Sequence, residues 1–205
     1  MVDSTSRYMA FSTLRQDAGS DLAAGKDLAE RKYGAQGSLR TGVSVALTGQ
    51  GTGAVTITSI WDSSDACFAA RAAIYGDPEV QAWILANNQV GVSFGLSKVR
   101  QEVGNCEGVF ACTAVATATD HSDESSDSAT AQIERVIMPH GINGFRQVQL
   151  IAAGETTGAY INLFYTNSVD AYLAGSAAAW SDAGFVAASQ KIGATIVDRL
   201  ISKML

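Results

Sequence analysis

The side chains best suited to acid–base chemistry in this chain are its two histidines, because an imidazole has an unperturbed pKa close to neutrality. His140 follows Ile133 and Ile137 at helical spacing, which aims it toward the surface that this helix covers. Pro139 and Gly141 on either side indicate that the helix ends there. The pattern makes His140 a candidate acid–base and ligand-contacting residue, with a structural role at a helix end as the alternative.

The second histidine, His121, stands in the acidic run Asp120–Asp127. Hard cations take several oxygen ligands, but a calcium loop needs a glycine at its sixth position, which this run lacks. We therefore expect a solvated loop that leads into a helix cap, with His121 exposed and no metal site.

Two segments, 49–53 and 154–158, have glycines at both ends and could be mistaken for phosphate-binding loops. A phosphate loop requires a preceding strand and a following helix N-terminus, with a Lys-Ser/Thr pair in the nucleoside triphosphate type. Here a strand pattern follows each segment and no lysine is near the first. Both are predicted to be hairpin turns.

The aromatic residues are core material by default, but in a hollow fold some of them would line a pocket. Trp61 ends a strand pattern, Tyr160 and Tyr165 belong to another, and Trp180 belongs to a helical one. These four residues, together with His140, are the candidates for ligand contacts.

Composition limits the class of partner. The 205 residues carry a net charge of −6, with scattered basic residues, whereas nucleic acid and anionic lipid both require clustered Lys and Arg. No apolar run approaches the ~18 residues that span a bilayer, and the N-terminus lacks the apolar stretch of a secretory signal. Cys67, Cys106 and Cys112 lack CxxC spacing, which indicates reduced thiols. We expect a soluble cytoplasmic protein without nucleic acid or membrane partners, for which a homo-oligomer is possible.

The elements that must position these side chains occur twice. A long stretch of the first half aligns without a gap on the second half at an offset of 105 residues. Ser63 and Ser168 stand where a helix N-cap belongs, and Asp65 and Asp170 follow in the positively polarised first turn. Because both carboxylates recur in the same setting, we interpret them as helix-start residues and not as a catalytic pair.

Each half predicts the order β-α-β-β-α-β, with its second helix broken near the middle. The first half gives strand 8–15, helix 20–33, strands 41–48 and 54–61, broken helix 63–86 and strand 90–99. The second gives strand 109–118, helix 127–138, strands 145–152 and 159–165, broken helix 168–189 and strand 195–202. We place the two ferredoxin-like repeats at residues 1–104 and 105–205.

Several strands are apolar on both faces, for example the one that contains Val148, Leu150 and Ile151. A sheet buried on both sides requires a second layer, and the other half is the natural supplier. The predicted fold class is α+β: two ferredoxin-like βαββαβ repeats packed sheet-to-sheet as an intrachain α+β barrel.

Two segments carry a resemblance to a known family. The run from Trp61 to Phe68, followed by Asp77 to Ala82, resembles the third strand and second helix of the dimeric α+β barrel superfamily. This superfamily includes antibiotic-biosynthesis-type monooxygenases and haem-degrading relatives. In the second half, the run from Trp180 to Ser189 is similar to a haem-degrading run that ends in the histidine ligand of the iron. The resemblance implies a ligand cavity between sheet and helices.

The resemblance also implies roles for single positions. Trp180 matches the tryptophan of the family's Asn/Trp/His triad, and Tyr75 takes the corresponding place in the first half. Ser189 occupies the position of the iron ligand, Trp83 lies near the equivalent histidine position, and neither first strand contains the family's asparagine. We therefore predict no cofactor.

Three functions remain open. The leading one is binding of a small apolar or aromatic ligand. The second is a cofactor-independent monooxygenase-like enzyme acting on an aromatic or polyketide-like substrate, with His140 as acid or base and Trp180 holding the substrate. The third is a structural oligomer subunit without a small-molecule site. A mixed-polarity cavity containing His140 or Trp180 favours the enzyme, an apolar cavity favours binding, and a filled interior favours the structural role.

Overall fold

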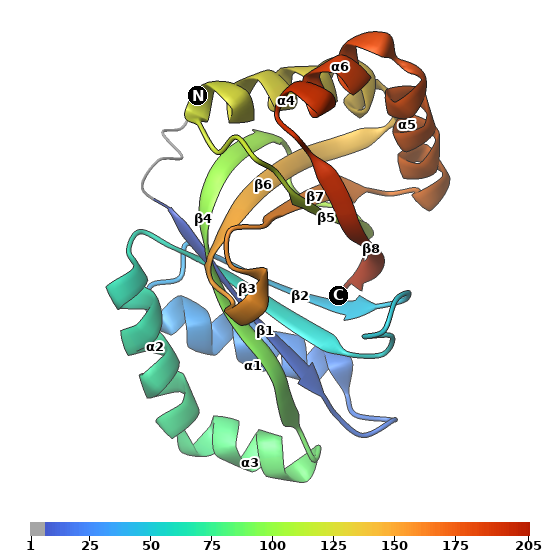
Figure 1. The fold of residues 1–205 in the computed structure, drawn as a ribbon. Helices are drawn as coiled ribbons and strands as arrows, with labels where there is room; N and C mark the ends of the chain where they lie inside the picture. Colours follow the sequence, from blue (N-terminus) through green and yellow to red (C-terminus); the bar gives the residue numbers. More distant parts are fainter. Residues whose placement is uncertain (1–6) are drawn as a thin grey trace.

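The computed structural model describes residues 7–205, which form one closed eight-stranded barrel with helices on its outside (Figure 1). The first half contains β1 (Tyr8–Arg15), α1 (Leu22–Ala35), β2 (Arg40–Ala46), β3 (Val55–Trp61), α2 (Ser64–Gly76), α3 (Pro78–Ala86) and β4 (Val90–Gly104). The second half contains β5 (Phe110–Thr117), α4 (Asp123–Val136), the 3-10 turn η2 (Met138–His140), β6 (Ile142–Ala152), the 3-10 turn η3 (Gly154–Thr156), β7 (Tyr160–Thr166), α5 (Val169–Ser181), α6 (Ala183–Lys191) and β8 (Thr195–Met204). The predicted fold class, two ferredoxin-like repeats in one α+β barrel, is confirmed.

The barrel is closed by two seams between the halves. Its strand order is β1-β3-β2-β8-β5-β7-β6-β4, so each half contributes four adjacent antiparallel strands. At one seam, residues 96–104 of β4 pair with residues 144–152 of β6, and at the other, residues 44–46 of β2 pair with residues 202–204 of β8. Closure pairs the edge strands of both four-stranded sheets, which would otherwise present free backbone groups.

The inside of the barrel holds a cluster of apolar side chains from both halves, and the helices cover its outside. Figure 1 shows α1, α2 and α3 against the strands of the first half, with α4, α5 and α6 against those of the second. The buried interior cluster contains Met9, Ile60, Val99, Cys106, Ala111, Val148, Leu163 and Tyr165. Each half has one further apolar cluster, between its strands and its helices. Two cavities lie in these layers under the helices, and a further one of about 350 Å³ is lined in part by Ile60, Cys106 and Tyr165 of the interior cluster.

The repeated serine and aspartate positions are helix starts, as the sequence predicted. The Ser63 hydroxyl accepts a hydrogen bond from the backbone N–H of Ala66 at 3.1 Å, and α2 begins one residue after it. The Ser168 hydroxyl accepts from Ala171 at 3.2 Å before α5. Asp65 and Asp170 lie in the first turns of these helices, where negative charge is favourable.

The break in each second helix is fixed by an aspartate that caps the next helix. Asp77 caps α3, and its carboxylate forms an ion pair with the ammonium of Lys32 from α1 at 2.6 Å. Asp182 caps α6, accepting from the N–H of Phe185 at 2.8 Å, and pairs with the guanidinium of Arg135 from α4 at 2.5 Å. In both halves, the end of the first helix is thereby tied to the start of the third.

The two largest differences between predicted and observed element boundaries both involve contacts between the halves. β4 continues to Gly104 instead of ending at residue 99, because its extension pairs with β6. α4 begins at Asp123 instead of residue 127, and Ser122 caps it. Arg100 of β4 donates to the Asp123 carboxylate at 2.5 Å, so the same seam holds the start of this helix. None of the helices in residues 7–205 combines the length and hydropathy needed to cross a bilayer.

The Asp182–Arg135 pair predicts a specific pH dependence of stability. The hydrogen bond from Arg135 lowers the pKa of Asp182 to about 2 from an ordinary 3.8. A carboxyl with a lowered folded pKa contributes stability above its unfolded pKa and loses that contribution as the pH falls through the folded value. Asp182→Asn keeps a capping oxygen but removes the charge. We expect a lower free energy of unfolding near neutral pH, with the difference from wild type shrinking between pH 3.8 and about 2.

Urea denaturation across this pH range measures the effect, and Arg135→Gln supplies the matched control. In the Arg135→Gln background, the additional effect of Asp182→Asn should lose most of its pH dependence, because the partner charge is gone. A wild-type–mutant difference that stays constant from neutral pH down to about 2 would contradict this account.

Candidate functional site

A cavity of about 120 Å³ lies in the second half, between the outer face of the sheet and helices α4, α5 and α6. Much of its wall is alanine, from strands as well as helices: Ala114, Ala116, Ala129, Ala179 and Ala188. Such short side chains leave the layer between sheet and helices incompletely filled. The volume is close to that of apolar cavities of ~150 Å³ that accept a benzene ring.

Aromatic rings form the remaining apolar walls. Phe164 of β7 and Tyr172 of α5 lie with their ring centroids 5.4 Å apart, and both line the cavity. Trp180, at the end of α5, meets Phe185 of α6 edge to face at 5.7 Å. Trp180 is 47% exposed, so it stands at the rim of the cavity where a ligand would enter or leave.

One polar group is held so that it donates into this apolar space. Successive side chains of a strand alternate between its faces, so Tyr160, Asn162 and Phe164 of β7 share the face toward the helices. Ser126 donates to the side-chain oxygen of Gln147 at 2.7 Å, and the Gln147 amide nitrogen donates to the side-chain oxygen of Asn162 at 3.0 Å. With its oxygen engaged, Asn162 presents its NH₂ group, which has no partner in residues 7–205, to the cavity.

A tyrosine–histidine pair lies at the same cavity. The Tyr160 hydroxyl is 3.1 Å from Nδ1 of His121, and the two rings stack with centroids 5.6 Å apart. His121 is exposed, and Gln149 also approaches its Nδ1 at 3.3 Å. Arg100 donates to the backbone oxygen of His121 at 3.2 Å, so the first half helps to place this ring. Burial raises the pKa of Tyr160, which keeps its phenol protonated at neutral pH.

The acidic group nearest to this pair is a fixed carboxylate. Asp120, which lines the cavity, accepts hydrogen bonds from the Ser125 hydroxyl and from the N–H of Ser122. These bonds, the Ser125 one foremost, lower the pKa of Asp120 to about 2. Asp120 is therefore an acceptor at neutral pH and cannot donate a proton to a ligand.

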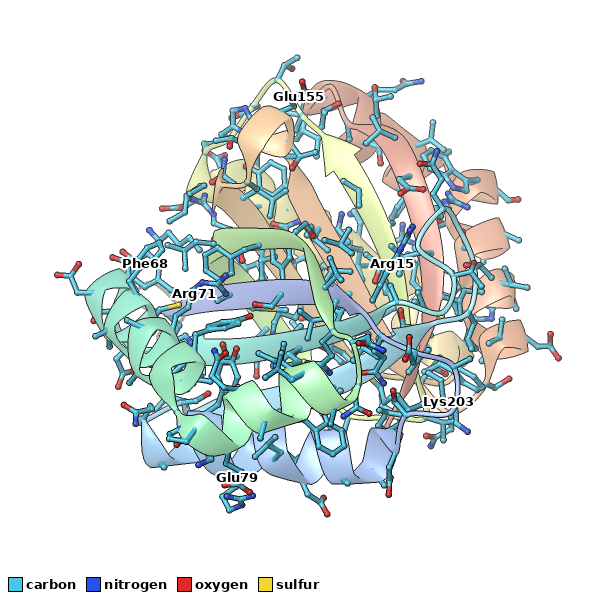
Figure 2. All side chains as sticks on the ribbon, turned by 90° about the horizontal axis from the view of Figure 1, so that it is seen from below. Arg15, Phe68, Arg71, Glu79, Glu155 and Lys203 are labelled. Atoms are coloured by element: carbon cyan, nitrogen blue, oxygen red, sulfur yellow. The ribbon has the colours of Figure 1, made fainter. Side chains whose placement is uncertain are left out.

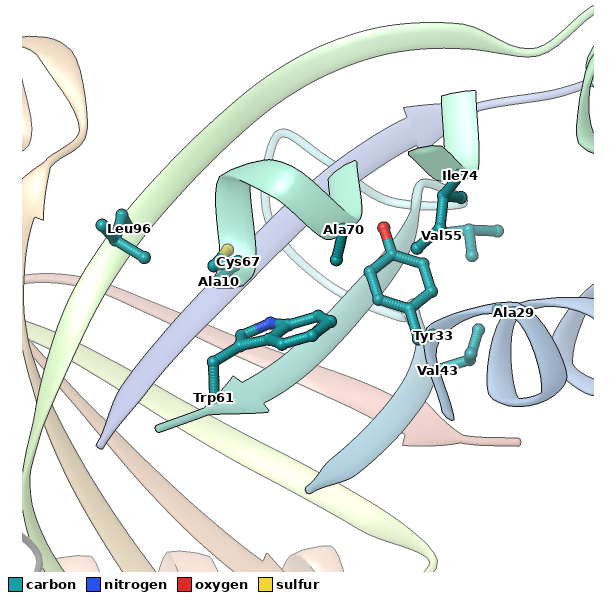
Figure 3. Packing of buried hydrophobic residues seen from close by; sticks show 10 residues of the cluster. All are labelled: Ala10, Ala29, Tyr33, Val43, Val55, Trp61, Cys67, Ala70, Ile74 and Leu96. Atoms are coloured by element: carbon teal, nitrogen blue, oxygen red, sulfur yellow. The ribbon is translucent and has the colours of Figure 1, made fainter. Parts of the chain in front are cut away.

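Of the residues expected from the sequence to contact a ligand, Tyr160 and Trp180 line this cavity. Trp61 does not, because it is 1% exposed in the core of the first half, beside Tyr33 and Cys67, with its indole N–H donated to Ser59 at 2.8 Å (Figure 3). Tyr165 lies on the opposite face of β7, inside the barrel, where it belongs to the interior cluster.

His140 is also absent from the cavity, and the expectation that it points toward the sheet is wrong. α4 ends at Val136, and Met138–His140 form a 3-10 turn that leaves His140 exposed. Helical spacing from Ile133 therefore does not extend to it. Sequence reasoning missed Asn162, which the alternation along β7 would have indicated, and the contact of His121 with Tyr160, which depends on the distant seam at Arg100.

The residues around the cavity do not fit a histidine-ligated haem. Protein ligands of haem iron are His, Cys, Met or Tyr side chains. Within residues 7–205, no histidine, cysteine or methionine lines the cavity, and the residue at the resemblance's ligand position is Ser189. Of its two tyrosines, Tyr160 is bonded to His121, and burial raises the pKa of Tyr172, which disfavours a phenolate. Residues 7–205 also contain no cluster of three or more His, Cys, Asp or Glu that could hold a metal ion.

Comparison with known proteins identifies the fold. An anthrone oxidase-like protein superposes with a TM-score of 0.64 at 11% identity, covering 98% of this chain and 92% of that one. A monooxygenase-like protein from Lactobacillus acidophilus gives 0.62 at 9% identity, covering 98% and 93%. A chlorite dismutase from Candidatus Nitrospira defluvii gives 0.54 at 10% identity, covering 98% and 92%.

This chain has the dimeric α+β barrel fold. The resemblance seen in the sequence is thereby confirmed at the level of the fold, with both halves of the barrel in one chain. No family model and no curated protein matches the sequence. At identities near 10%, the likeness establishes the arrangement of the chain and carries no activity with it.

The absence of a histidine from the cavity wall predicts the outcome of a haemin titration. We expect no sharp, stoichiometric Soret shift that depends on a histidine, because neither His121 nor His140 lines the half-two cavity. Absorption spectra of wild type, His121→Ala and His140→Ala measure this directly. A stoichiometric shift in wild type that either substitution abolishes would show that one of these histidines ligates the iron.

Proposed function

We propose that this α+β barrel protein binds a small, neutral aromatic molecule that carries a carbonyl or similar acceptor oxygen. The site is the half-two cavity. The observation that carries the proposal is the Asn162 amide, oriented by the chain Ser126–Gln147–Asn162 so that it offers N–H donors within an alanine- and aromatic-lined space. Asn162 is partly buried, and its amide N–H groups are available to donate to a ligand oxygen.

The walls favour a flat ring. Phe164 and Tyr172 supply ring faces and edges inside, and Trp180 at the rim can cover part of a bound ring. Aromatic pairs gain about 0.5–1.5 kcal/mol beyond the area they bury. The wall is mostly apolar, with a few polar side chains that include Asn162 and Arg199, and this mixed polarity suits recognition of ligand orientation, which a structural subunit would not need.

The test compares 1-tetralone with tetralin, which has the same bicyclic body without the carbonyl. Isothermal titration calorimetry of wild type should show tighter binding of the ketone. Asn162→Ala should weaken tetralone binding by about 3- to 10-fold, the equivalent of one hydrogen bond, and leave tetralin binding nearly unchanged. Trp180→Ala should weaken both ligands.

Asn143→Ala is the matched control, since the Asn143 amide is exposed and donates to the backbone oxygen of Glu107 outside the cavity. It should bind tetralone as wild type does. Equal affinities of wild type for tetralone and tetralin, or an Asn162→Ala protein with undiminished preference for the ketone, would contradict the proposal.

A second candidate function, cofactor-independent oxidation of such a ligand, is favoured by one observation: the His121–Tyr160 pair at the cavity wall. This pair provides a route by which a proton taken from a bound ligand reaches an exposed imidazole. His140, which the sequence suggested for this role, does not line the cavity.

Anthrone is a suitable test substrate, since one structural neighbour is named anthrone oxidase-like. With dioxygen it gives anthraquinone and water. If the protein catalyses this reaction, oxygen uptake will exceed the uncatalysed rate, and Tyr160→Phe and His121→Ala will lower it while His140→Ala will not. Uptake equal to that of buffer alone would reject this second candidate and leave the binding proposal unaffected.

A further inference from the structure

The first half contains a separate cavity of about 370 Å³, between its strands and helices α1, α2 and α3. Apolar side chains form most of its wall: Leu14, Leu28, Ile57, Ile74, Val80 and Trp83. Two cationic residues also line it, Lys32 and Arg71, and no Asp or Glu of the described residues does. It is unexpected that both charged side chains in this wall are cationic, because the protein has a net charge of −6.

Only one of the two cations is neutralised by the protein. The Lys32 ammonium lies 2.6 Å from Asp77 and 2.9 Å from Glu79. Arg71, which extends from α2 toward the strands in Figure 2, has no carboxylate within 4.0 Å in residues 7–205. Its charge is therefore free to interact with an anion that enters the cavity.

The guanidinium of Arg71 is held in one orientation by two rings. Its central carbon lies 4.6 Å from the centroid of the Tyr75 ring and 4.0 Å from that of the Phe94 ring. Nη1 donates one hydrogen bond, to the Ser12 hydroxyl at 3.1 Å. A guanidinium has five N–H donors in a planar fork, so stacking on its faces leaves edge donors available for a carboxylate.

A buried phenol stands beside the same group. Burial raises the pKa of Tyr33 to about 12, partly opposed by a hydrogen bond with Ser12 and by the charge of Arg71. Tyr33 thus remains a neutral donor next to the guanidinium, and it lines the cavity together with Tyr75. The polar groups gather around Ser12 and Arg71, while the apolar wall extends from Leu28 to Trp83.

The two halves have exchanged the polarity of equivalent positions. At the offset of 105 residues, Arg71 corresponds to Ser176 and Ile57 corresponds to Asn162. All four residues line their respective cavities. In the first half the helix supplies a cation and the strand an apolar side chain, whereas in the second half the strand supplies a neutral donor. The half-two cavity also has a cationic lining residue, Arg199, but it comes from strand β8 and not from a helix.

We propose that the half-one cavity is a second binding site, for a monocarboxylate with an apolar, ring-sized body. Arg71 holds the carboxylate, with Tyr33 as an additional donor, and the body lies against the apolar wall. This site is distinct from the half-two cavity and does not depend on the function proposed there.

The test uses 2-naphthoate and its uncharged counterpart 2-naphthamide, titrated calorimetrically against the full chain. Wild type should bind the carboxylate about tenfold or more tightly than the amide, as a charge-assisted hydrogen bond would give. Arg71→Met keeps the length of the side chain and should abolish this preference. Arg15→Met, which removes an exposed arginine from β1, should retain it.

If Arg71→Met does not fold, the titrations of wild type still test the proposal. Equal affinity of wild type for carboxylate and amide, or no binding of either, would overturn it. A preference for 2-naphthoate that survives in folded Arg71→Met, or that disappears in Asn162→Ala, would place the anion elsewhere and overturn it too. Failure of tetralone to bind would leave this result intact, since that ligand reports on the other cavity.

Discussion

Closure of the eight strands into one barrel is the constraint on which the other features depend. Each four-stranded half has two edges, and the pairings of β4 with β6 and of β2 with β8 remove all of them. The seam between β4 and β6 carries an ion pair in which the buried Arg146, 3% exposed, donates to the more exposed Glu102 at 2.8 Å. Loss of Glu102 would be costly, because it would leave the buried Arg146 guanidinium without a compensating charge. Outside the barrel, each half has one layer between its strands and its helices, and the two proposed binding cavities lie in these layers.

The features that were predicted correctly from the sequence are those set by local interactions. Caps such as Ser63 and Ser168, and the helix breaks at Asp77 and Asp182, are set within a few residues of chain, and their recurrence exposes the repeat. Strands that are apolar on both faces need a second layer, and the barrel provides it. The extension of β4 was not predictable in this way, since it exists only where β6 of the other half pairs with it.

The candidate site was predicted in part, for the same reason. Tyr160 and Trp180 were expected to contact a ligand and do line the cavity, because strand alternation and helical position fix their direction. His140 was misplaced because a 3-10 turn ended the helical periodicity. His121 reaches Tyr160 through a loop that Arg100, more than twenty residues earlier in the chain, holds in place. Contacts of that kind are set by the tertiary fold and leave no periodic signal in the sequence.

The central claim is that a neutral aromatic ligand occupies the layer between the second sheet and α4, α5 and α6, and not the inside of the barrel. Intermolecular nuclear Overhauser effects between bound 1-tetralone and the labelled protein test it most directly. The account predicts contacts from ligand protons to the Asn162 side-chain amide and the Trp180 indole, which line that layer. Contacts to the barrel-interior methyl groups of Met9, Val99 or Val148 would contradict it.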